Sequence, residues 1–95
     1  MSNPIALDKL MTKTNEEMSE LTKILCKSML HGLDSYNPDD GVTNIESINE
    51  EIADVIACVN LLSQKIPGVY VNQDRVNRKM EFISKQLHID EINNE

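Results

Sequence analysis

Two short stretches of this chain place carboxylates at a spacing that could hold a metal ion. They are EEMSEL at 16–21 and EEIADV at 50–55. The side chains concerned are Glu17, Glu20, Glu51 and Asp54. Residues three apart share one face of an α-helix, so each pair projects from one side of its helix. If the two helices packed antiparallel, the four carboxylates would converge into the oxygen-only ligand set that Mg²⁺ or Mn²⁺ prefers.

The surroundings of the second pair favour a site over a solvated surface, although acid pairs are common on solvated helix faces. The row through Glu51 and Asp54 continues into Cys58 and Leu61, which are apolar. We therefore expect this row to become buried. Like charges that are close together and partly desolvated are unfavourable, so either protons or a cation should offset them.

The elements that must position these acids are helices. Apolar residues recur at steps of three and four over about 4–30, 44–66 and 72–88, which is helical periodicity. Turn-forming residues separate these segments at 31–41 and 67–68. No alternating strand pattern of useful length is present. The sequence predicts an all-α fold, a helical hairpin followed by a third helix.

Capping residues place the helix starts. Asn-Pro at 3–4 predicts an N-cap followed by proline at the first helical position. Thr43 with Glu46 fits a capping box at the start of the second helix. Thr14 with Glu17 also fits one, which allows the first segment to be two helices that meet near residue 14.

The apolar stripe of the second helix is too extensive for one hairpin to cover. With one Phe, two Tyr and no Trp, a chain of 95 residues buries only a modest core. We therefore expect a homo-oligomer, a homodimer or homotetramer, in which hairpins pair into a four-helix-bundle type of assembly. The stripe consists of Ile45, Ile48, Ile52, Val55, Val59, Leu62 and Ile66.

Composition limits the class of protein. The 16 acidic and 9 basic residues give a net charge of −7, which argues against nucleic acid or an anionic membrane as partner. No apolar run approaches the roughly 20 residues of a membrane span, and no secretory signal is visible, so we expect a cytoplasmic protein. The chain reads as one domain over 1–95, with a frayed polar tail at 89–95. Cys26 and Cys58 lie in apolar runs and are expected in the core.

The acidic stretches resemble the signature of the MazG-like all-α nucleoside triphosphate pyrophosphohydrolases. That signature has E-x-x-E on one helix and E-x-x-D on the next, matched here by EEMSEL and EEIADV. RVNRKME at 75–81 is similar to the N-x-K stretch of a later helix in the family, with Asn77 and Lys79 at the matching positions. The resemblance covers about 14–82, and the size looks like that of the small phage or prophage members.

The resemblance implies a Mg²⁺-dependent enzyme, with Mn²⁺ as an alternative ion, that cleaves a (deoxy)nucleoside triphosphate to the monophosphate and pyrophosphate. Lys79 would offset phosphate charge, and Asn77 would orient an oxygen or a water molecule. Glu16 or Glu50 would accept a proton from the attacking water, or each is a plain surface acid. The implied metal ligands are Glu17, Glu20, Glu51 and Asp54.

Two other functions remain open at this point. A phosphoribosyl-ATP pyrophosphohydrolase has similar acids but would normally have more basic residues near its site. A helical interaction module without chemistry would also explain the regular stripe of the second helix, because such stripes suit oligomer interfaces. A test of divalent metal binding distinguishes these functions, because both enzymes should bind such an ion and the interaction module should not.

Overall fold

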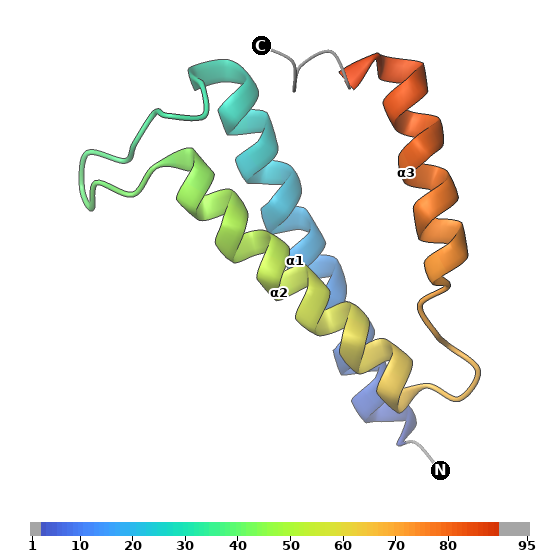
Figure 1. The fold of residues 1–95 in the computed structure, drawn as a ribbon. Coiled ribbons are helices and arrows are strands. Elements are labelled where there is room, and N and C mark those ends of the chain that lie inside the picture. The colour runs from blue at the N-terminus through green and yellow to red at the C-terminus, as the bar shows by residue number, and fades with distance from the viewer. Residues whose placement is uncertain (1–2, 90–95) are drawn as a thin grey trace.

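The computed structural model describes residues 3–89 and contains, over these residues, three helices and no strand. The expected all-α hairpin with a third helix is confirmed: α1 and α2 lie antiparallel, and residues 66–72 lead from α2 to α3 (Figure 1). None of the described helices has the length and apolarity to cross a membrane. The tail expected at 89–95 lies outside the described residues beyond residue 89. The helices are α1 (Pro4–His31), α2 (Asn44–Lys65) and α3 (Gln73–Leu87).

Side-chain caps fix the starts of the hairpin helices where the sequence predicts them. The Asn3 carboxamide oxygen accepts a hydrogen bond from the Ile5 N–H at 2.9 Å. At the start of α2, the Thr43 hydroxyl accepts from the Glu46 N–H at 3.2 Å and donates to the Glu46 carboxylate. Both caps satisfy backbone donors that the first turn of a helix leaves without a partner.

The first segment is one continuous helix, so the alternative of two helices meeting near residue 14 is wrong. Thr14 is buried, and its hydroxyl donates to the Leu10 carbonyl at 2.8 Å instead of capping a new helix. A threonine can bond in this way to the carbonyl four residues earlier without interrupting the helix.

Asn44 fixes the loop between the hairpin helices. It is 2% exposed, and its side-chain amide donates to the Gly32 carbonyl at 2.8 Å. Its backbone N–H donates to the Ser35 carbonyl at 2.9 Å. Gly32 ends α1 with a φ of 95°, a backbone conformation that favours glycine. These bonds tie the end of α1 to the start of α2 and so help to fix the register of the hairpin.

The core of a single chain is thin. Within the described residues, Cys58 is the one buried apolar side chain, and the second cysteine, Cys26, is exposed. The expectation that both cysteines lie in the core is therefore right for Cys58 and wrong for Cys26. Buried or half-buried positions recur every three or four residues on the facing sides of α1 and α2. On α2 they include Asn44, Ile48, Glu51, Val55, Cys58 and Leu62.

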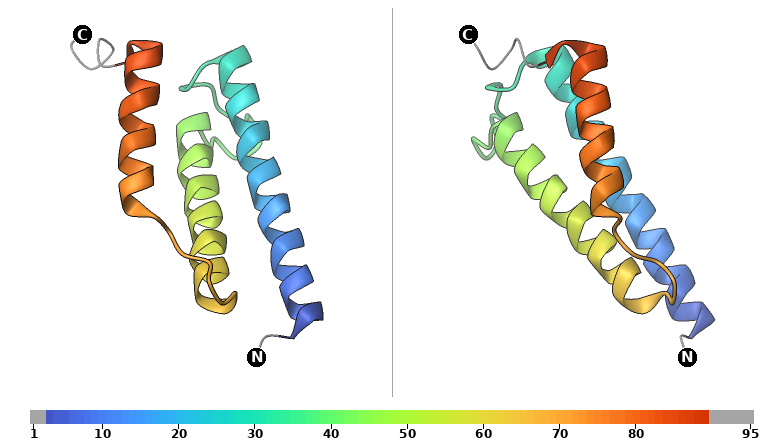
Figure 2. Two further views of the ribbon diagram at one scale, coloured as in Figure 1. Left: turned by 90° about the vertical axis from the view of Figure 1, so that its right-hand side faces the viewer. Right: turned by 45° about the vertical axis from the view of Figure 1, so that its right-hand side comes forward.

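The third helix stands apart from the hairpin. No Cα atom of α3 lies within 8 Å of one in α1 or α2, and the separation is visible in Figure 1 and in the left view of Figure 2. The radius of gyration is 16.6 Å. A compact chain of this length would have about 12.4 Å. A single copy therefore leaves much of its apolar surface in water.

Candidate metal centre on the hairpin

Three carboxylates from the two hairpin helices meet where the acidic stretches come level. Glu17 of α1 and Glu51 and Asp54 of α2 each offer one oxygen, and the three oxygens lie within 4.8 Å of one another. We call these three residues the carboxylate cluster. Glu20, the fourth expected ligand, is exposed one turn further along α1 and is not part of this group. The antiparallel packing thus brings together three of the four predicted ligands.

Glu17 and Glu51 are shielded from water because they occupy the contact rows of their helices. Glu17 lies one turn from buried Thr14 and is itself only 16% exposed. Glu51 is half-buried between Ile48 and Val55, one turn away on each side, while Asp54 is exposed at the edge of the contact.

The buried residues of α2 do not follow the expected row from Glu51 through Asp54 and Cys58 to Leu61. Cys58 is buried, but Leu61 is 42% exposed. From Glu51, half-buried and buried positions instead follow steps of four, three and four residues, through Val55 and Cys58 to Leu62. This row follows the face of α2 that packs against α1, so Asp54 lies beside the row and Glu51 lies on it.

The charge on Glu51 is poorly compensated in a single chain. Partial burial raises the pKa of its carboxyl, and the negative charges of Asp54, Glu17, Glu20 and Glu50 raise it further. One of its oxygens, Oε2, is buried and finds no hydrogen-bond partner among the described residues. A shielded carboxylate oxygen without a donor is where a proton or a cation would be most favourable.

Lys13 compensates the charge of Glu17 instead. Its ammonium group lies 3.1 Å from Glu17 Oε1 and 3.4 Å from Glu16 Oε2. These contacts raise the pKa of Lys13. Sequence reasoning missed this residue, although its position four residues before Glu17 is the signal that could have found it. Lys13 therefore competes with any cation for one ligand of the cluster.

The remaining predicted residues lie outside the cluster. Glu16 is exposed and pairs with Lys13, and Glu50 is exposed beside Glu51. Asn77 and Lys79 belong to α3, which does not approach the hairpin of its own chain. The Asn77 oxygen accepts from the Gln73 side chain at 2.9 Å, and Lys79 Nζ lies 5.3 Å from the ring centroid of Phe82.

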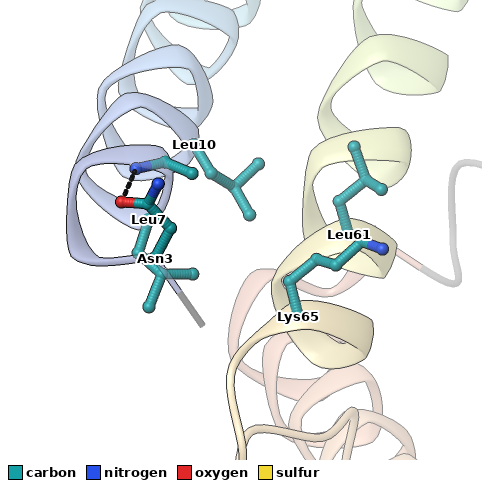
Figure 3. Close-up of a pocket in the computed structure, with 6 residues that line it drawn as sticks. Asn3, Leu7, Leu10, Leu61 and Lys65 are labelled. Carbon is teal, nitrogen blue, oxygen red and sulfur yellow. Dashed lines mark hydrogen bonds between the residues drawn. The ribbon is translucent and has the colours of Figure 1, made fainter. Parts of the chain in front are cut away.

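An apolar groove lies elsewhere on the hairpin, between the start of α1 and the end of α2. Figure 3 shows Leu10 and Leu61 on its two sides, with Asn3 and Lys65 at its edge. Leu10 precedes Glu17 by two turns, about 10 Å along the helix. The groove contains no carboxylate and is separate from the cluster.

Comparison with known proteins gave no matching family model, no matching curated protein and no matching solved structure. The functional conclusion therefore rests on the geometry of the hairpin and on the resemblance of its two acidic stretches to the MazG-like signature.

Proposed function

We propose that this protein is a divalent-metal-dependent nucleoside triphosphate pyrophosphohydrolase. One observation carries the proposal: the oxygens of Glu17, Glu51 and Asp54 lie within 4.8 Å of one another, and Glu51 Oε2 is buried with no donor among the described residues. An acidic patch on a solvated face would leave each of its oxygens open to water. The resemblance of both acidic stretches to those of the MazG-like group supports the same activity.

The donor set fits Mg²⁺ or Mn²⁺, because both favour carboxylate oxygens and take waters and substrate phosphates as remaining ligands. When bound, such an ion would neutralise phosphate charge and lower the pKa of a water. The carboxylate cluster would hold the ion, and Glu20, one turn away on α1, would extend the ligand set. A water would attack a phosphorus, the phosphoanhydride bond between the α- and β-phosphates would break, and Glu16 or Glu50 would accept the proton of the water, so that the monophosphate and pyrophosphate are the products.

The assembly that we propose is a homo-oligomer, at least a dimer, in which two hairpins form four helices. Each hairpin helix has a row of three apolar residues, spaced seven apart, whose side chains are 37% to 50% exposed. Because successive residues of a helix are about 100° apart, both rows lie on the side of the hairpin opposite Asp54 and Glu20. Antiparallel packing sets each residue of one row level with a residue of the other. These pairs, which we call the hairpin apolar face, are Met11 with Val59, Met18 with Ile52, and Leu25 with Ile45.

A second candidate is an interaction module without chemistry. The hairpin apolar face favours it, because an exposed face of this kind serves an assembly whether or not the opposite flank binds metal. The two candidates differ in one property. A module has no reason to bind Mg²⁺ at the carboxylate cluster, or to lose such binding when Glu51 becomes Gln.

The test is to incubate the purified protein with ordinary and modified nucleoside triphosphates and Mg²⁺ and to measure pyrophosphate. We expect release of pyrophosphate with at least one nucleotide, and its loss on addition of a chelator. Calorimetry with Mn²⁺ in the absence of nucleotide measures the metal site separately. Metal binding without hydrolysis of any nucleotide would reject the enzyme and keep the site; absence of both would leave the interaction module.

A further inference from the structure

The third helix has an apolar stripe that neither of the other two helices of its own chain covers. Val76, Met80, Ile83 and Leu87 follow steps of four, three and four residues along α3 and are 36% to 62% exposed. Fourteen of the fifteen residues of α3 are exposed. An isolated helix of 15 residues is only marginally stable in water. Another surface must therefore pack against this stripe.

The chain exposes enough surface for an extensive contact with a second copy. Its accessible area is 7746 Å². A compact monomer of this mass would expose about 5,500 Å², so the excess is about 2,200 Å². A contact of standard size between two hairpins removes about 800 Å² per copy, which leaves more than half of this excess. Obligate homodimers bury about 2,000 Å² or more in total, that is about 1,000 Å² or more per copy, which a contact that also includes α3 would reach.

The connector directs α3 away from its own hairpin. The Ile66 N–H donates to the Leu62 carbonyl at 3.0 Å, and the Val69 N–H donates to the Ile66 carbonyl at 3.1 Å. Gly68 has a φ of 84°, and the Asn72 side chain caps α3 by accepting from the Arg75 N–H. The connector is thus a hydrogen-bonded turn followed by a capped helix start. Exchange of an identical element between copies is a low-cost route to a dimer, and this connector leaves α3 clear of its own hairpin.

Charge also favours a second copy as the occupant. Residues 3–72 contain eleven acidic and five basic residues and have a net charge of −6. Two hairpins brought together therefore repel each other. The third helix has four basic and two acidic residues, a net charge of +2, and contains both arginines of the chain. Packing the α3 of each copy against the hairpin of the other places basic side chains against an acidic surface twice in one dimer. Three further acidic residues follow the helix at 90–95, so this complementarity is that of α3 itself.

We propose that two copies exchange α3, so that the α3 stripe of each copy packs against exposed apolar residues of the other copy's hairpin. The contact is symmetric and closes on itself, as in a two-fold dimer. Asn77 and Lys79 belong to α3, so the exchange also brings them next to the partner copy's hairpin, which contains the carboxylate cluster of that copy. The exchange rests on α3 and the hairpin surfaces and does not depend on the proposed hydrolysis.

The first test uses the full chain without metal or nucleotide. Sedimentation should show a dimer for the wild type. Met80→Glu places a charge on the stripe and should raise the dissociation constant of the dimer at least 100-fold, because a buried charge without a partner is unfavourable. Lys85→Gln makes the same change in net charge on the opposite side of α3 and should leave the dissociation constant within about threefold. A wild-type monomer, or equal effects of the two variants, would overturn the proposal.

The second test separates exchange from other arrangements. In a dimer formed by mixing methyl-labelled and unlabelled protein, isotope-filtered NMR detects contacts between copies only. We expect contacts from Met80 and Ile83 of one copy to hairpin methyl groups of the other. Contacts of these residues only within one copy would show that α3 folds back on its own hairpin. A dimer with no contact from α3 would show pairing through hairpins alone. Either result refutes the exchange, whatever the protein hydrolyses.

Discussion

Replacing Glu51 with Gln removes one charge from the carboxylate cluster while keeping the shape and helix propensity of the side chain. Glu51 is the member of the cluster with a buried, unpartnered oxygen and a raised pKa. In the absence of metal, we expect the variant to be at least as stable as the wild type. In the presence of metal the order should reverse, because the variant has lost a ligand.

The expected size of the metal effect follows from linkage. Metal that binds only the folded state at 100 times its dissociation constant stabilises it by about 2.7 kcal/mol. If loss of the Glu51 charge weakens binding about 100-fold, the same metal concentration stabilises the variant by only about 0.4 kcal/mol. For a domain of this size, the melting temperature should rise by roughly 11–22 °C in the wild type and by about 2–3 °C in the variant.

The assay is thermal unfolding with and without MgCl₂, with NaCl at the same ionic strength as a reference. Asp8→Asn is the matched control, since it removes one negative charge from the exposed surface of α1, about 13 Å along the helix from Glu17. It should keep the full effect of Mg²⁺. Equal shifts with Mg²⁺ and NaCl, or a full Mg²⁺ shift in Glu51→Gln, would refute a metal site at this cluster.

The pH dependence of the metal-free protein gives an independent check. Because the folded state raises the pKa of Glu51 above its ordinary value of 4.5, the associated stability is complete below that value and is lost as pH rises through the raised pKa. The wild type should therefore lose stability relative to Glu51→Gln over this range. Metal affinity should rise over the same range, because the ion requires the ionised carboxylate. Parallel stability curves for the two proteins would contradict the assigned pKa shift.

Three further predictions concern the neighbours of the cluster, the loop and α3. Lys13→Gln should raise Mn²⁺ affinity several-fold in calorimetry, because it frees the Glu17 oxygen now held at 3.1 Å; unchanged affinity would show that Lys13 does not compete. Asn44→Ala should lower the free energy of unfolding in urea by about 1–3 kcal/mol, because the Gly32 carbonyl loses its donor, and no change would mean that water replaces it. Lys79→Ala should raise KM for the nucleotide while the Mg²⁺ shift in melting temperature stays; loss of both would place Lys79 at the metal.

Local features of the hairpin could be predicted from the sequence because they depend on neighbours along the chain. The spacing of apolar residues indicated three helices, and Asn3 and Thr43 indicated where two of them begin. The same periodicity placed Glu17 and Glu51 next to apolar stripes. Thr14 misled because a threonine suits a cap and a mid-helix bond to the preceding turn equally well. In the fold it is buried, and its hydroxyl bonds to the Leu10 carbonyl within a continuous helix.

Only the tertiary structure decided which acids meet and where α3 lies. Spacing puts Glu20 on the same helix face as Glu17, but the loop bond between Asn44 and Gly32 helps to set the register that brings Glu17 beside Glu51 and Asp54. The separation of α3 has a different cause. The amphipathic pattern of α3 indicates that its apolar side packs against another surface. The geometry of the connector and the exposed surfaces of the hairpin determine which surface that is. Sequence periodicity determines which face of a helix is apolar, but the partner of that face depends on contacts between residues far apart in the chain or in different chains.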